Sequence, residues 1–153
     1  MNKLILLTII TFLSLILLCS CSSTSNITII NEHNKPVKGC MLLISQSNML
    51  YINSHKAILT NSDGKASFSM RGLVNIYAGM KGYDVSHQST VDDAEIILKI
   101  LPQTKQSDLG SQLTIDIANK CKGKIATKWI EYFKKYKPSV ISLPKLGRHQ
   151  PHK

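Results

Sequence analysis

The side chains with the most versatile chemistry in this sequence are four cysteine thiols. Cys19 and Cys21 lie close together near the N-terminus, whereas Cys40 and Cys121 are far apart in the chain. In an exported protein, two free thiols tend to form a disulfide. We therefore predict a bridge between Cys40 and Cys121, which would close a loop of about 80 residues and contribute roughly 3–5 kcal/mol. The alternative is two reduced thiols, with Cys40 buried as a small apolar residue.

Histidines, which can bind metals or transfer protons, are scattered through the chain. His33, His55 and His87 lie in or beside predicted turns and strand ends, where a surface position is expected. His149 and His152 are close together, but two ligands on a C-terminal tail make a weak metal site. We predict no metal site from these residues.

Carboxylates and short catalytic motifs offer little more. Asp92, Asp93 and Glu95 precede a predicted strand, and a solvated turn explains them. The segment Asn61–Gly64 resembles part of a calcium loop but lacks the later glutamate ligand. The sequence contains no phosphate-binding loop, nucleophile elbow or HExxH motif. We therefore predict no cofactor and no catalytic residue, and a protein that is not an enzyme.

The N-terminal segment has the order of an export signal. Lys3 precedes an apolar run over 4–18, which is shorter than the roughly 20 residues of a membrane-spanning helix. Residues 18–21 read Leu-Cys-Ser-Cys and resemble the lipobox of bacterial lipoproteins. The resemblance implies that residues 1–20 are removed as a signal peptide and that Cys21 is diacylated on its sulfur. An ordinary cleaved signal or an uncleaved anchor is the alternative.

Lipidation at Cys21 would decide where the protein resides. Each buried CH₂ of an acyl chain contributes about 0.8 kcal/mol, so two or three chains hold a protein durably on a membrane. Ser22 is not the aspartate that usually retains lipoproteins in the inner membrane, so the resemblance implies the outer membrane of a bacterial envelope. The polar residues 21–26 predict a short tether between the lipid and the folded domain.

The formal net charge of +10 is spread unevenly along the chain. Residues 21–101 contain seven Lys or Arg and six Asp or Glu, whereas residues 102–153 contain eleven and three. This asymmetry predicts a nearly neutral domain with a basic appendage. Such an appendage favours anionic surfaces, including phospholipid headgroups and wall polymers. Export makes a nucleic acid the least favoured partner, and we predict none.

Residues 27–101 predict a mainly β fold, a Greek-key β-sandwich of about seven strands. Short apolar or alternating runs are separated there by Gly, Pro, Asn and Asp. Strands are expected near 27–31, 38–45, 49–52, 56–60, 65–70, 73–79, 82–88 and 94–101, some of which must merge. The last of these is apolar on both faces, so we expect the C-terminal segment to cover it.

The turn and core residues of this region resemble those of carboxypeptidase regulatory-like domains, also described as prealbumin-like or transthyretin-like. The residues that carry the resemblance are Asn34, Pro36, Val37, Gly39, Thr60, Asp63, Gly64, Phe68, Ala78, Lys81, Gly82 and Tyr83. The resemblance covers about half of the chain. It implies a seven-stranded sandwich that acts as a non-catalytic accessory module.

Residues 102–137 predict a partly helical, basic extension. Ser107 has the residue type to cap a first helix, although alternation over 113–117 leaves a strand as an alternative. A second, amphipathic helix over 124–137 should end before Pro138. Its aromatic stripe either packs on the sandwich with the lysines solvated, or lies on a membrane or a partner. The candidates for contact with an anionic surface are Lys124, Lys128, Lys134 and Lys135.

Residues 138–153 are rich in Pro, Lys and His and predict a flexible tail. Together, the features of the sequence predict a non-catalytic lipoprotein of the bacterial envelope. Cys21 would anchor it in the outer membrane, and its sandwich would bind a protein or glycan partner. The alternative is a lipoprotein subunit of an envelope-spanning secretion apparatus, because type VI secretion lipoproteins also contain a transthyretin-like sandwich.

Overall fold

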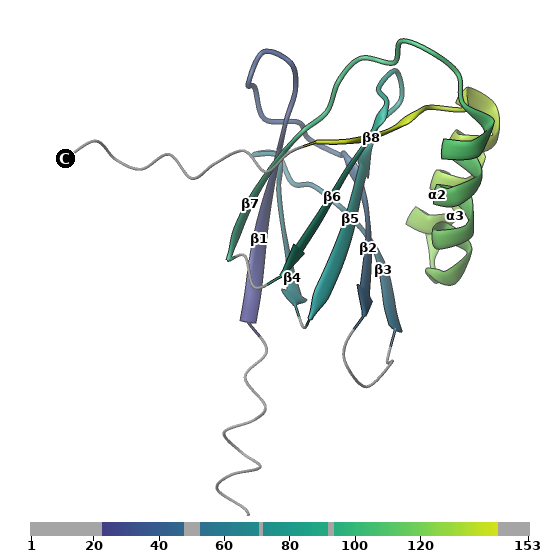
Figure 1. The fold of residues 1–153 in the computed structure, drawn as a ribbon. Helices are drawn as coiled ribbons and strands as arrows, with labels where there is room; N and C mark the ends of the chain where they lie inside the picture. The colour runs from purple at the N-terminus through teal and green to yellow at the C-terminus, as the bar shows by residue number, and fades with distance from the viewer. Residues whose placement is uncertain (1–22, 48–52, 71, 92–93, 144–153) are drawn as a thin grey trace, which may run out of the picture.

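The computed structural model describes residues 23–47, 53–70, 72–91 and 94–143. In this part of the chain, eight strands form two sheets and two helices lie beside one of them (Figure 1). The three-stranded sheet has the order β4-β1-β7, with β1 at Ser23–Ile30, β4 at Lys65–Met70 and β7 at Glu95–Lys99. The predicted mainly β sandwich is therefore confirmed.

The second sheet has five strands in the order β3-β2-β5-β6-β8. Its strands are β2 at Met41–Ser47, β3 at Asn53–Leu59, β5 at Leu73–Gly79, β6 at Val85–Val91 and β8 at Val140–Ser142. Most neighbouring strands in the two sheets are antiparallel, but β1 pairs with β7 in parallel and β6 pairs with β8 in parallel.

The main hydrophobic core lies between the two sheets. Strand alternation builds it, because every second side chain of a strand points to the same face. In β1, Ile27 and Ile29 are fully buried, whereas the alternating residues Asn26 and Thr28 are more exposed. The other strands, and Ile100 just after β7, contribute in the same way, with Leu42, Ile44, Phe68, Val74, Ile76, Ala78, Ile96 and Leu98.

A second core lies on the other face of the five-stranded sheet, beneath helices α2 (Asp108–Lys120) and α3 (Lys124–Tyr136). Leu43 and Tyr77 point to this face, where Trp129 and Phe133 of α3 cover them. The apolar run in β2 is thus explained by burial on both faces. The expectation that the C-terminal segment covers the last predicted strand is wrong: Ile97 of β7 is 49% exposed, and the helices lie over the five-stranded sheet instead.

Both predicted helices form. The hydroxyl of Ser107 accepts a hydrogen bond from the Gly110 amide at 3.2 Å, so the first segment starts with a capped helix and not with a strand. The second helix ends where Lys137 adopts a left-handed conformation with φ of 45°, immediately before Pro138. No helix in the described part of the chain is both long enough and apolar enough to cross a bilayer.

Two predicted boundaries differ from the structure. β1 begins at Ser23, so most of the predicted tether over 21–26 is strand. β8 lies inside the predicted flexible tail over 138–153, because the Ser139 amide donates a hydrogen bond to the buried Asp84 carboxylate at 2.8 Å and brings the chain beside β6. The strand predicted at 49–52 lies outside the described residues.

Candidate functional site

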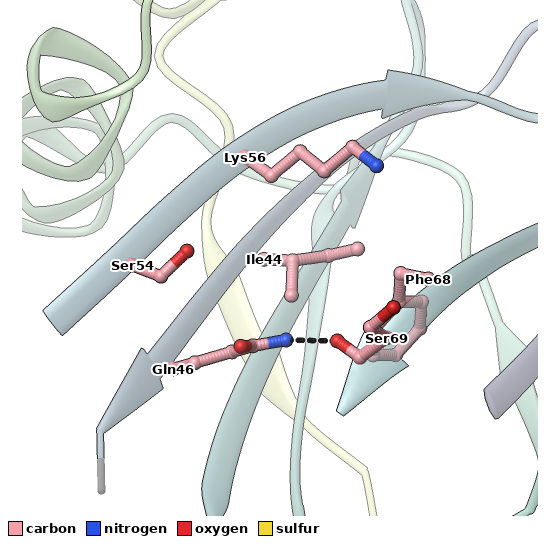
Figure 2. A pocket seen from close by; sticks show the side chains of 6 residues that line it. All are labelled: Ile44, Gln46, Ser54, Lys56, Phe68 and Ser69. Atoms are coloured by element: carbon pink, nitrogen blue, oxygen red, sulfur yellow. Dashed lines mark hydrogen bonds between the residues drawn. The ribbon is translucent and has the colours of Figure 1, made fainter. Parts of the chain in front are cut away.

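A groove lies between the two sheets beside β3 and β4, which are edge strands of their sheets. Figure 2 shows the six side chains that line it. They come from β2, β3 and β4 and are Ile44, Gln46, Ser54, Lys56, Phe68 and Ser69.

The groove has an apolar floor and a polar rim. The floor is formed by Ile44 and Phe68, which are 1% and 3% exposed and point toward each other from β2 and β4 (Figure 2). At the rim, the Gln46 side-chain amide donates a hydrogen bond to the Ser69 carbonyl and so connects the two sheets. The cavity volume of about 180 Å³ is smaller than the roughly 300–1,000 Å³ of small-molecule pockets. It is close to the roughly 150 Å³ that accepts one benzene ring, so the groove can receive one apolar side chain.

Lys56 places a positive charge beside this apolar floor. Its register opposite Ile44 directs it to the inner face of the five-stranded sheet. Among the described residues, no carboxylate lies within ion-pair distance of it. A bound partner could therefore offer an apolar side chain to the floor and an acidic group to Lys56.

The four lysines predicted to contact an anionic surface all lie on α3, and all are exposed. Lys124 and Lys128 are in its first half, whereas Lys134 and Lys135 are in its last turn. The aromatic stripe of α3 points away from them: Trp129 and Phe133 are fully buried against the sheet, with ring centroids 4.6 Å apart. The alternative in which this stripe lies on a membrane is therefore wrong, and only the lysine face is available to a partner.

The structure does not contain the predicted disulfide. Cys40 and Cys121 are both free and buried. Cys40 belongs to the core between the sheets, and its thiol donates a hydrogen bond to the Gly79 carbonyl at 3.4 Å. Cys121 follows α2 and belongs to the core beneath the helices, on the other face of the five-stranded sheet. Burial raises the pKa of Cys40 to about 12 and also raises the pKa of Cys121, so both thiols stay protonated.

His87 belongs to a polar cluster that joins β5, β6 and β8. Its ring stacks on Tyr77, and its two nitrogens lie 3.2 Å from the Ser142 hydroxyl and 3.3 Å from the Asn75 side-chain oxygen. The Ser89 hydroxyl donates to the same Asn75 oxygen at 2.6 Å, and is 3.4 Å from the imidazole. The Ser89 hydroxyl is therefore closer to the amide oxygen than to the imidazole, whereas the Ser142 hydroxyl is within hydrogen-bond distance of the other ring nitrogen of His87.

The remaining polar candidates have structural positions. His33 is exposed beside Glu32, and His55 is half-buried in β3. In the turn that ends at Gly64, the Asn61 side chain accepts hydrogen bonds from two backbone amides, which explains its place there without a calcium ion. Glu95 is exposed at the start of β7. Within the described residues, no group of three or more His, Cys, Asp or Glu could hold a metal ion.

Some candidates lie outside the described residues. They are Cys19, Cys21, Asp92, Asp93, His149 and His152. Two features of the site were missed at the sequence level. Lys56 was not singled out, although its place on the same strand face as an apolar residue could have indicated an inward-pointing charge. Lys120 and Lys122, on either side of Cys121, precede the predicted second helix and were not among the predicted contact residues.

Comparisons with known proteins show the fold alone. No protein-family model and no curated protein sequence matches the chain. Among solved structures, 3-chlorocatechol 1,2-dioxygenase from Rhodococcus opacus 1CP is 7% identical, with a TM-score of 0.47 over 54% of this chain and 60% of that chain. Catechol 1,2-dioxygenase from Acinetobacter radioresistens is 11% identical, with a TM-score of 0.45 over 55% and 53%. The pilus 2b backbone protein of group B streptococcus is 11% identical, with a TM-score of 0.42 over 54% and 42%.

The chain therefore covers less than two thirds of each of these proteins. The prediction that it is not an enzyme is corrected: two of the structures named above are dioxygenases, and a likeness of fold at 7–11% identity assigns neither catalysis nor its absence to this chain. That prediction had used only the absence of familiar motifs, and a sandwich fold is compatible with catalysis and with binding alike. The expected carboxypeptidase regulatory-like resemblance is supported at the level of a β-sandwich, whereas membership of that family is not shown.

Proposed function

We propose that this protein is a lipoprotein of the bacterial envelope whose β-sandwich is a protein-interaction module. The lipobox around Cys21 supports an acyl anchor, and Ser22 supports the outer membrane as its location. The folded domain begins at Ser23, so the anchor and the sandwich are directly consecutive in the chain. Nothing in the described residues favours the alternative of a secretion-apparatus subunit, which stays a prediction.

The observation that carries the interaction role is the groove beside β3 and β4. Its volume suits a single side chain, and its floor of Ile44 and Phe68 is apolar. The free edge of β3 also offers backbone donors and acceptors to an extended segment, a common mode of peptide recognition. We therefore propose an extended partner segment with an apolar residue next to an acidic one.

Site-specific photo-cross-linking in cells tests this proposal. A photoreactive residue at Ser54, on the groove rim, should give a discrete adduct that disappears when Lys56→Glu reverses the local charge. The same residue at Ser62, exposed in the turn before β4, should not give that adduct. Lys65→Glu is the matched charge reversal, because Lys65 is exposed on β4 and does not line the groove. Adducts at Ser54 that ignore Lys56→Glu would contradict the assignment of the groove.

A further inference from the structure

The end of the sandwich that carries the N-terminus can be identified from strand register. Ser23, the first residue of β1, pairs with Met70, the last residue of β4. The Ser69 carbonyl, one residue before Met70, accepts a hydrogen bond from the Gln46 side chain, so the end of β2 lies at this same end of the sandwich. The chain then returns in β3, whose first residue pairs with Ser47. We call this end of the sandwich the N-terminal end.

The connection between α2 and α3 lies at this same end. The opposite ends of the two helices are held together by Lys137 and Asp108, whose charged groups are 2.6 Å apart. The Tyr132 hydroxyl, near the end of α3, lies 2.7 Å from the Met80 carbonyl in the turn between β5 and β6, far from the N-terminal end. The two antiparallel helices run alongside the strands (Figure 1), so residues 121–123 that join them return toward the N-terminal end. In agreement, the charge of Lys120 acts on His55, close to the start of β3.

Three exposed lysines surround this connection: Lys120, Lys122 and Lys124. We call them the basic corner. No carboxylate of the described chain lies within ion-pair distance of any of them. In the two helices, Asp116 precedes Lys120 by one turn of α2, and Glu131 follows Lys124 by about two turns of α3. The corner therefore carries an excess of positive charge on the helical side of the N-terminal end.

We propose that the basic corner contacts anionic phospholipid headgroups of the membrane in which Cys21 is anchored. This proposal rests on the lipid anchor of the proposed function. Cys21 is two residues before the first strand residue, and each residue spans at most about 3.5 Å, so the anchor holds the N-terminal end within roughly 7 Å of the bilayer surface. That distance is comparable to the screening length of about 8 Å at physiological salt. The short connection thus keeps the end of the sandwich that carries the basic corner on the membrane side.

The geometry also separates the lysines along α3. Lys134 and Lys135 follow Lys124 by about ten residues, which is roughly 15 Å along a helix at 1.5 Å per residue. They therefore lie more than a screening length from the basic corner, toward the end of the sandwich away from the anchor. Lys105, in the segment before α2, is exposed at the same distant end. These three lysines form a natural control for the three of the basic corner.

Amine footprinting of the processed protein in vesicles tests the contact. The protein is inserted in phosphatidylcholine vesicles, with or without phosphatidylglycerol, and acetylation of each lysine is followed by mass spectrometry. With phosphatidylglycerol at low salt, Lys122 and Lys124 should react several-fold more slowly, and high salt should remove the difference. Lys134 and Lys135 should react equally in both vesicles. Equal rates for the corner lysines in both vesicles would overturn the proposal.

A pair of triple variants separates this proposal from the anchor itself. Lys120, Lys122 and Lys124 are changed to Gln in one, and Lys105, Lys134 and Lys135 in the other. The Cys21 peptide of each sample is examined by mass spectrometry for acyl chains. A Cys21 peptide without acyl chains would refute the lipid anchor. In that case, co-sedimentation of the unacylated protein with the phosphatidylglycerol vesicles tests whether the basic corner binds anionic headgroups. Each lysine at an anionic surface strengthens binding up to about five-fold, so the corner variant should bind far less than the control variant. Equal binding of the two variants would overturn the proposal.

Discussion

His55 of β3 lies close to Lys120 at the end of α2, and this proximity changes the acidity of its ring. Burial of the imidazole and, to a smaller extent, the charge of Lys120 lower the pKa of His55 below its ordinary value of 6.5. Its Nδ1 atom is buried without a hydrogen-bond partner. Burial likewise lowers the pKa of His87. Two imidazoles are thus held neutral beneath or beside the helices.

Because the pKa values of these two histidines are lowered by folding, we predict that the protein loses stability in mild acid. The unfolded chain binds their protons from pH 6.5 downward, whereas the folded chain resists doing so until its lower pKa values are reached. The free energy of unfolding should therefore fall as the pH drops below 6.5. Denaturant titrations at about pH 7.5 and pH 5.5 measure this fall. A double variant with His55→Gln and His87→Gln should show a smaller fall in the free energy of unfolding. The control variant His33→Gln, at an exposed ring, should show the same fall as the wild type. An equal fall in all three proteins would contradict the assignment.

Gly64 is predicted to be the most sensitive glycine in the turns. Its φ is +69°, and a Cβ atom there would lie 2.7 Å from the Ile29 carbonyl oxygen and 2.8 Å from the Val37 amide nitrogen. Gly64→Ala should therefore lower the free energy of unfolding by about 2 kcal/mol or more. Gly82→Ala is the control, because its φ is +87° but no atom lies within 4 Å. It should cost only the conformational strain of about 1 kcal/mol. Equal losses in urea titrations would be evidence against backbone crowding at Gly64.

Trp129 holds the helical pair on the sheet. It is fully buried, and its ring would lie 3.4 Å from a Cβ atom placed at Gly79 of β5. Trp129→Ala should lower the free energy of unfolding by about 3–5 kcal/mol. Leu109→Ala, at a side chain that is 85% exposed, should change it by no more than about 0.5 kcal/mol. If the two variants unfold at the same urea concentration, the second core contributes little to stability.

The thiols should be free but slow to react in the folded protein. Both Cys40 and Cys121 are buried, and burial raises the pKa of each. Because the thiolate is the reactive form, iodoacetamide should modify neither residue at neutral pH. After unfolding without a reductant, both should become alkylated, as seen in the intact mass. If alkylation of the unfolded protein requires a reductant, Cys40 and Cys121 form the disulfide that the sequence predicted.

Local patterns were sufficient to predict the sandwich. The alternation of Ala66 and Phe68 with polar neighbours and the turn residues around Gly64 identified strands and turns correctly. The capping residue Ser107 and the stop at Pro138 placed the helices. These features depend on residues close together in the chain, where backbone sterics and side-chain period act directly.

Long-range arrangement was harder to predict. Strand propensity does not tell which sheet a helix covers, so the apolar faces of β2 and β7 could not be distinguished. The separation of Cys40 and Cys121 depends on opposite faces of one sheet, which only the assembled fold defines. β8 escaped prediction because three residues have little strand signal, and the buried Asp84 that holds them is distant in sequence.

The most direct test of the account is the chemistry of Cys21. Cells are fed an alkyne fatty acid, and label on the protein is compared among the wild type, Cys21→Ala and Cys19→Ala. The lipobox predicts label on the wild type and on Cys19→Ala, a processed N-terminus at Cys21, and no label on Cys21→Ala, which should keep its signal segment. Equal label on the wild type and on Cys21→Ala would contradict the lipid anchor on which the proposed function depends.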